Sequence, residues 1–380
     1  MFVALWLESI KMAQDALSAM NGSLEDVVGS FGMVPCIGYL PLGLTKTYMM
    51  KRDPLVFENM VKKLRNMFPK GIVTEEEHKI VKPALTRLNY VNKGYYWYNN
   101  MSLVIFLFDT YINGVHWAIG HDVPAVLPFG YWLPFDPAQS VPAFMILLNL
   151  QVWHAILAIW FSMCGDLLMF TFLTHISLQF DLLAVRIRRL IYVPVDKQLL
   201  AEYPLGLYDA EHLNDSKTTE DMRNGSYLKE VKDIIKNHYD LMRLAADVEG
   251  IYSFPMLIHF FNSSIIICFC TFCGALVENW NEMRYKCFLF VALFESLLLC
   301  WFGHRLIESS QDISQAVYNS GWYKASSKIK SSLLVILIRA QRPLHITTFG
   351  YSVISLKTFT TLIKTAWLYF TLLLNLYKKP

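Results

Sequence analysis

The residues whose types and spacing could do chemistry gather near the C-terminal end. Polar side chains recur there at helical spacing, with intervals of 4, 3, 7 and 4 residues: Lys357, Thr361, Lys364, Thr371 and Asn375. At about 100° per residue they form one stripe on a helix. The stripe could line a water-filled pore that apolar residues narrow and gate by dewetting. It could equally be a polar seam packed against another helix of the same chain, and the pattern leaves both interpretations open.

Ionisable residues also interrupt the apolar stretches, at Asp109, Asp166 and Glu295. Charges are costly inside a bilayer, so each is a candidate functional residue. Asp109 could simply sit at headgroup level, a structural hydrogen-bonding role for Asp166 is as plausible as a transport role, and Glu295 could pair with another helix. We find no phosphate-binding glycine loop, no nucleophile elbow and no metal-ligand cluster. We therefore expect neither an enzyme nor a metal or cofactor.

The composition indicates that membrane helices must position these polar and ionisable residues. Of the 380 residues, 54% are hydrophobic and only 17% are charged, and the mean hydropathy is +0.33. Soluble proteins carry about 25% charged residues. Six stretches are long and apolar enough for membrane helices: 27–50, 95–119, 142–178, 254–278, 287–303 and 355–377. The sequence predicts an all-α, multi-pass membrane protein, with seven spans if residues 1–20 contribute one.

Basic residues predict the orientation. Ten lie in 51–94, none lies between Lys93 and Arg186, and six lie in 304–354. Cytoplasmic segments retain Lys and Arg, so we place 51–94, 179–253 and 304–354 in the cytoplasm and the C-terminus outside. This orientation is opposite to that of a G-protein-coupled receptor. The balanced net charge of +3 gives no indication of a nucleic-acid partner.

Three further segments have specific predictions. Residues 209–236 are the most polar stretch and predict a solvated cytoplasmic loop. Residues 333–338 are six consecutive apolar residues, too short to span a membrane. We expect them to be buried in the cytoplasm, and we favour a contact between subunits over packing within the chain. The sequon at Asn21 lies in a predicted outside loop, where glycosylation is possible.

Sequence motifs resemble those of the insect odorant receptor family. They are Gly303-His304-Arg305-Leu306-Ile307-Glu308, Gly321-Trp322-Tyr323, the ending from Ser355-Leu356-Lys357 to Asn375-Leu376, and upstream Leu127-Pro128-Phe129 with Trp132-Leu133-Pro134-Phe135-Asp136. The resemblance covers roughly residues 60–377. It implies a seven-span subunit, with its N-terminus inside, of a tetrameric ligand-gated cation channel. The first span looks shortened relative to the family.

The resemblance divides the chain into three parts. Residues 1–303 would form the ligand-binding bundle, 304–354 the cytoplasmic anchor for subunit contacts, and 355–380 the pore-lining last helix. The resemblance also places the gate and its polar ring on that helix, at Leu368, Leu372, Asn375 and Leu376.

The second cytoplasmic loop lacks the large insertion of the family's coreceptor. The chain therefore resembles an odorant-tuning subunit that assembles with the coreceptor in the plasma membrane of a sensory neuron dendrite. Its ligand would be a small volatile odorant, bound in the outer half of the membrane. By resemblance the ligand site comprises Ile37, Tyr39, Asn99, Ser102, Phe106, Leu147, Leu148, Gln151, Phe290, Leu293 and Phe294. The alternatives are a gustatory-receptor-type channel and, less favoured, a G-protein-coupled receptor.

Overall fold

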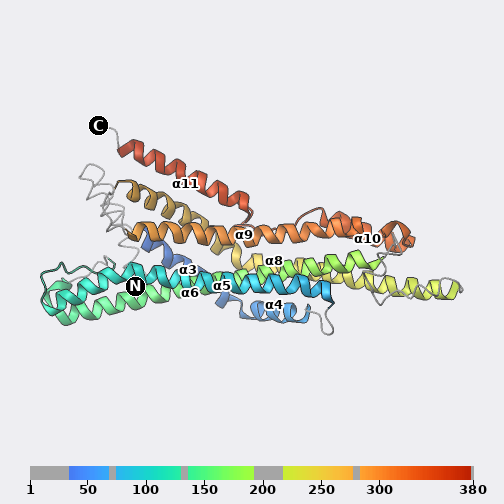
Figure 1. Cartoon of the computed structure of the whole chain (residues 1–380), viewed down its shortest axis with the longest axis horizontal. Coiled ribbons are helices and arrows are strands. Elements are labelled where there is room, and N and C mark those ends of the chain that lie inside the picture. The colour runs from blue at the N-terminus through green and yellow to red at the C-terminus, as the bar shows by residue number, and fades with distance from the viewer. Residues whose placement is uncertain (1–33, 68–73, 130–135, 192–216, 277–282, 378–380) are drawn as a thin grey trace.

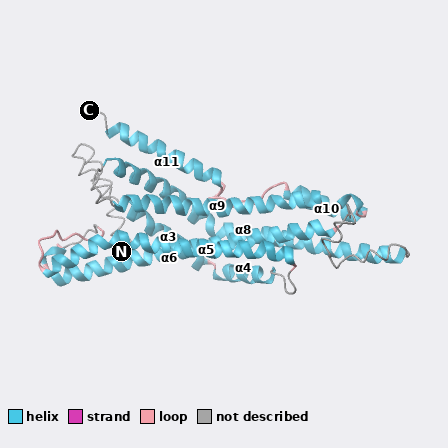
Figure 2. Cartoon of the chain, in the orientation of Figure 1, coloured by secondary structure: helices cyan, strands magenta, loops and turns pink. Residues whose placement is uncertain are grey.

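The computed structural model describes residues 34–67, 74–129, 136–191, 217–276 and 283–377, without the side chains of 34–41, 50, 217–226, 276, 283–285 and 376–377. Figure 1 shows an elongated bundle whose longest helices run along one axis. The described residues are helices joined by short connections (Figure 2). An all-α architecture follows from the apolar stretches, because a backbone inside lipid must satisfy its own hydrogen bonds.

Eight α-helices make up the described part of the chain. They are α3 (Val34–Arg52), α4 (Pro54–Met67), α5 (Glu75–Ile119), α6 (Val141–Leu190), α8 (Lys217–Leu276), α9 (Met283–Asn319), α10 (Ser327–Ala340) and α11 (Leu356–Tyr377). Among them α5, α6, α8 and α9 are long and apolar enough to cross a membrane. Helices α3 and α11 coincide with the first and last predicted spans.

The helices are longer than the apolar stretches that predict them. Helix α6 has 50 residues and α8 has 60, which at 1.5 Å per residue gives lengths of about 75 and 90 Å. A bilayer core is about 30 Å thick, so both helices project far beyond it. The prediction of a solvated loop over 209–236 is wrong from Lys217 onward, because α8 begins there. Buried Val231 and Ile234 give this polar stretch an apolar face, which packs into the core and stabilises the helix.

Local sequence fixes the ends of α5. Thr74 is the N-cap: its hydroxyl accepts a hydrogen bond from the Glu77 backbone N–H, and the Glu77 carboxylate accepts one from the Thr74 N–H. This capping box satisfies two donors that the first turn leaves unpaired. At the other end Gly120 has a φ of 100°, a left-handed conformation that favours glycine. Residues next to each end in the sequence therefore set where α5 begins and ends.

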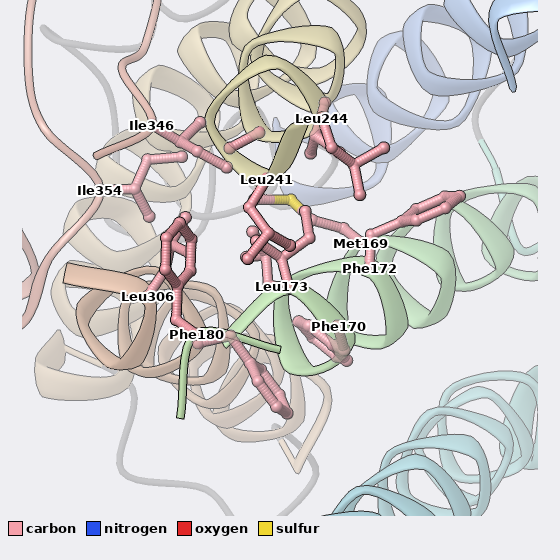
Figure 3. Close-up of a cluster of buried hydrophobic side chains, with 14 of the residues drawn as sticks. Met169, Phe170, Phe172, Leu173, Phe180, Leu241, Leu244, Leu306, Ile346 and Ile354 are labelled. Atoms are coloured by element: carbon pink, nitrogen blue, oxygen red, sulfur yellow. The ribbon is translucent and has the colours of Figure 1, made fainter. Parts of the chain in front are cut away.

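The main core lies where α6, α8 and α9 pack together (Figure 3). Helix α6 contributes Met169, Phe170, Phe172, Leu173 and Phe180, which meet Leu241 and Leu244 of α8 and Leu306 of α9. Phe170 stacks on Phe302 of α9 with ring centroids 4.7 Å apart. Ile346 and Ile354, from the connection between α10 and α11, close the same cluster. These three helices form the trunk on which the other elements rest.

The connection between α10 and α11 is held against the trunk by specific contacts. The Thr347 backbone N–H donates to Oε1 of Glu249 on α8 at 3.0 Å. A Cβ at Gly303 of α9 would lie 2.6 Å from the Ile354 carbonyl oxygen, so the backbones approach as closely as glycine permits. The start of α11 is thereby fixed on α8 and α9, at one edge of the molecule (Figure 1).

Helix α10 buries only part of the apolar run at 333–338. Leu333 and Ile336 are buried, whereas Leu334, Val335 and Ile338 are more than half exposed. The expectation that the whole run is buried is therefore not met within one chain. One face packs on α9 and the other remains open.

Candidate functional site

A buried ion pair joins α3 to α6 in the middle of the bundle. The Lys46 Nζ atom lies 2.6 Å from Oδ1 and 2.7 Å from Oδ2 of Asp166, and both side chains are 0% exposed. A Cβ at Gly165 would lie 3.0 Å from the Lys46 side chain, so the lysine stem packs tightly on the backbone of α6. Glycine at 165 therefore makes room for the lysine beside its partner.

The ion pair belongs to a larger polar network. Lys46 Nζ also lies 3.3 Å from Oε1 of Glu295 on α9, and the same Oε1 lies 3.3 Å from Nδ1 of His259 on α8. The other ring nitrogen of His259 faces the hydroxyls of Ser263 at 3.4 Å and Ser296 at 3.3 Å. Glu295 thus connects the lysine to the histidine.

Hydroxyl groups complete the network. Tyr95 of α5 donates to Oδ2 of Asp166 at 3.0 Å, and Ser162 accepts from Lys46 Nζ at 3.1 Å. Tyr252 of α8 donates to the Gly165 carbonyl oxygen at 3.2 Å. The network therefore joins five helices, α3, α5, α6, α8 and α9. Charges in such surroundings are stable only when paired and hydrogen-bonded.

A small cavity lies directly against this network, between α5, α6 and α9. Its volume is about 40 Å³, enough for a few water molecules. The lining residues are Tyr95, Asn99, Ser102, Leu103, Phe106, Ile159, Ser162, Met163, Cys287, Phe288, Val291 and Glu295. Tyr95, Ser162 and Glu295 belong to both the cavity and the charged network. The cavity lining is thus mostly apolar, with polar groups where it meets the charged network, as in small-molecule sites generally.

Three of the predicted ligand residues line this cavity together: Asn99, Ser102 and Phe106 on α5. Their spacing of 3 and 4 puts them on one face of the helix. On α6, the lining residues are Ile159, Ser162 and Met163, about three turns deeper than predicted Leu147, Leu148 and Gln151. The cavity thus lies further from the N-terminal end of α6 than the predicted site does.

Gln151 has a different structural role. Its amide exchanges two hydrogen bonds with the backbone of Phe129, at 2.9 Å to the Phe129 N–H and 3.1 Å to its carbonyl oxygen. Phe129 in turn packs on Phe106, with centroids 5.9 Å apart. Gln151 therefore holds the outer loop against one cavity residue. Leu148 is fully buried elsewhere, beside Gly114 of α5.

The predicted α9 residues face away from the cavity. Phe290 is 62% and Phe294 38% exposed, and Leu293 packs at the edge of the main core. Their neighbours Cys287, Phe288, Val291 and Glu295 form the lining. The stretch 287–303 is apolar on nearly every side, so its pattern does not indicate which face turns inward.

Helix α11 presents its polar stripe to the outside of the chain. Lys357, Thr361 and Lys364 are exposed, as are the predicted gate residues Leu368, Leu372 and Asn375. On the opposite face Phe370 packs against Cys268 and Phe272 of α8. The stripe is therefore not a seam within the chain, over the described part of α11.

Several predictions fall outside the described residues or side chains. These are the ligand residues Ile37 and Tyr39, the gate residue Leu376 and the sequon at Asn21.

Sequence reasoning overlooked Lys46. The signal was present, because a lysine within the apolar stretch 27–50 requires a buried acid, and Asp166 and Glu295 were already candidates. The sequence alone could not show which acidic residues pair with Lys46.

A larger hollow lies between the N-terminal part of α5, the C-terminal part of α6 and the second half of α9. Its volume is about 340 Å³, and its lining includes Arg87, Arg188, Arg305, Asp181 and Asp312. Arg305 and Asp181 pair there at 3.0 Å. This lining, with its several charged side chains, differs from the mostly apolar lining of the smaller cavity.

Comparison with solved structures defines the class of protein. The insect olfactory receptor OR5 from Machilis hrabei matches with a TM-score of 0.75 at 16% identity, over 98% of this chain and 86% of that one. The same receptor in complex with eugenol matches with a TM-score of 0.73. The fold of the described residues is that of an insect olfactory receptor: a helical bundle in which four helices are long and apolar enough to cross a membrane.

Comparison of sequences identifies the family. The model of the family described as 7tm Odorant receptor matches residues 32–367. Odorant receptor 67c of Drosophila melanogaster is 24% identical over 357 residues, covering 93% of this chain and 81% of that relative. Odorant receptor 85b of the same species is 22% identical over 350 residues, covering 90% and 81%. The chain belongs to the odorant receptor family, as its motifs indicate.

Proposed function

We propose that this chain is the odorant-tuning subunit of a heteromeric, odorant-gated cation channel that includes the odorant receptor coreceptor. The observation that carries the proposal is the exposure of α11. A membrane helix with exposed Lys357, Thr361 and Lys364 on one face and Phe370 packed on α8 is suited to a water-filled pore shared by several subunits. Leu368, Leu372 and Leu376 would form the constriction, and Asn375 a polar ring.

The lysine at position 364 favours a mixed assembly. Four symmetric copies would place four positive charges along a cation pathway and repel the permeant ion. Dilution by coreceptor subunits would leave fewer. The absence of a coreceptor-type insertion in the second cytoplasmic segment is consistent with this role.

The open face of α10 supports an anchor at 304–354. Leu334, Val335 and Ile338 are exposed, and exposed Tyr318 and Tyr323 lie on adjacent elements. A contiguous apolar surface in the cytoplasm marks a protein contact. We assign it to the contact with neighbouring subunits, with residues 1–303 forming the ligand-binding bundle and 355–380 the pore helix.

The cavity beside the charged network is the proposed odorant site. Its apolar lining and few polar groups suit a small volatile organic molecule, and the Machilis hrabei receptor structure with eugenol supports a ligand of this size. At about 40 Å³ the cavity is too small for such a ligand without movement of its walls. A ligand would therefore bind an expanded state better than the one described here, and this difference in affinity would favour channel opening.

Recording from cells tests the proposal directly. The chain would be expressed alone and with an insect odorant receptor coreceptor, each with a C-terminal tag accessible from outside, and exposed to a broad panel of volatiles. We expect odorant-evoked cation current with the coreceptor and none without it. Surface expression without current in either condition would contradict the proposal. The same tag in neurons tests localisation to the dendritic plasma membrane.

A further inference from the structure

Glu295 stands at the boundary between the charged network and the cavity. Its side chain is only 3% exposed, and it is one of the residues that line the cavity. Among the described residues, its two polar contacts, with Lys46 and His259, both use Oε1 at 3.3 Å. The carboxylate therefore retains capacity to accept a hydrogen bond, since each carboxylate has two oxygens and about four acceptor positions.

The network holds one lysine and two carboxyl groups. With both acids ionised and His259 neutral, the single positive charge of Lys46 faces two negative charges. Lys46 Nζ lies closer to Asp166, at 2.6 Å, than to Glu295, at 3.3 Å. Glu295 is therefore the less closely paired of the two carboxyl groups. A buried carboxylate in this position gains from any additional hydrogen-bond donor.

The other polar groups of the cavity do not oppose this preference for a donor. The Tyr95 hydroxyl already donates to Asp166, and one N–H of the Asn99 amide donates to the Tyr95 carbonyl oxygen at 2.9 Å. The Asn99 amide keeps its second N–H and its oxygen, so it can donate or accept. The hydroxyls of Ser102 and Ser162 can donate or accept and do not discriminate.

We propose that the cavity selects odorants that carry a hydrogen-bond donor, a hydroxyl or amine group on a compact apolar body, with the donor bound to Glu295. This inference rests on the proposed function and narrows its ligand class. Leu103, Phe106 and Phe288 surround the body of the ligand, and Glu295 binds the donor. An ether or ester of the same shape would displace water from the carboxylate without replacing its hydrogen bond, which disfavours binding.

Matched ligand pairs test the inference without any mutation. Currents would be recorded from the chain with its coreceptor, using primary alcohols of four to eight carbons, benzyl alcohol and 2-phenylethanol. Each is compared with its methyl ether and with the corresponding amine. A hydrogen bond to a charged group contributes about 1.5–3 kcal/mol, so the EC50 of the ether should exceed that of the alcohol by about ten- to hundredfold. The same panel compares amines with alcohols, and the class with the lower EC50 identifies the donor group that the site prefers.

Glu295→Gln provides the second test. The amide keeps the shape of the side chain and leaves Lys46 balanced by Asp166, so the network becomes neutral. The alcohol-to-ether EC50 ratio should fall toward one, and Leu103→Val, which changes the apolar wall, should leave that ratio unchanged. A ratio within each variant is insensitive to its surface level, and a structural role for Glu295 would not change it.

The outcomes are separable. Ethers or esters that activate as potently as the matched alcohols and amines, or an alcohol preference that persists in Glu295→Gln, would overturn the inference while leaving the channel intact. An absence of current with every volatile would instead contradict the proposed function.

Discussion

Removal of the Lys46 charge is expected to destabilise the protein more than removal of either carboxylate charge. In Lys46→Met the carboxylates of Asp166 and Glu295 remain buried, at 0% and 3% exposure, without a cation. The network charge changes from −1 to −2. In Asp166→Asn the charge becomes 0, because Lys46 keeps Glu295 as its partner. The two substitutions at one ion pair therefore have unequal effects.

The magnitude follows from the burial. Breaking a buried pair by removing one partner costs about 3–5 kcal/mol, against a total stability of about 5–15 kcal/mol for a typical protein. Lys46→Met is thus expected to lose about a fifth or more of its stability. Adding Asp166→Asn to Lys46→Met should restore much of the loss, because one of the two uncompensated charges is removed.

The assay is surface level and thermal stability in detergent, measured by fluorescence-detected size exclusion on tagged receptor co-expressed with the coreceptor. Lys93→Met is the matched control, because Lys93 is exposed on α5. The expected order of stability is Lys93→Met, then Asp166→Asn, then the double variant, then Lys46→Met. Equal stability of Lys46→Met and Lys93→Met would refute the assignment of the network as a stabilising centre.

Three further substitutions test other contacts. Gly303→Ala should lower the melting temperature, because its Cβ would lie 2.6 Å from the Ile354 carbonyl oxygen and overpacking costs about 1–3 kcal/mol. Gln151→Leu removes two hydrogen bonds to the Phe129 backbone, and we expect the odorant EC50 to rise about tenfold, equivalent to about 1.4 kcal/mol. Val335→Asp places a charge on the open face of α10 and should reduce co-purification with the coreceptor at least severalfold while the chain itself still folds.

Each of these three substitutions has a control on the same or a neighbouring helix. Gly250→Ala meets nothing within 4 Å and should not lower stability. Asn149→Leu alters an exposed residue two positions from Gln151, and Ala246→Asp adds the same charge to an exposed position of α8, which neighbours α10. An effect of any control as large as that of its partner would remove the specific contact as the explanation.

The motifs and the apolar stretches determined the class of this protein from sequence alone. Spans are recognisable because about 20 apolar residues are needed to cross a bilayer, and the stripe on α11 is visible because helical periodicity is a local property. Asn99, Ser102 and Phe106 could be grouped for the same reason: they lie within two turns of one helix.

Only the tertiary structure decided how the helices face one another. Lys46 meets Asp166 and Glu295 across separations of 120 and 249 residues, which no local pattern encodes. Helix α9 turns Val291 and Glu295 inward, and not Phe290, because packing sets the rotation of a helix that is apolar on nearly every side. Helix α8 begins at Lys217, within a polar stretch, because Val231 and Ile234 find a core on other helices. Periodicity follows from neighbouring residues, whereas the pairing, rotation and length of the helices depend on surfaces that meet only after folding.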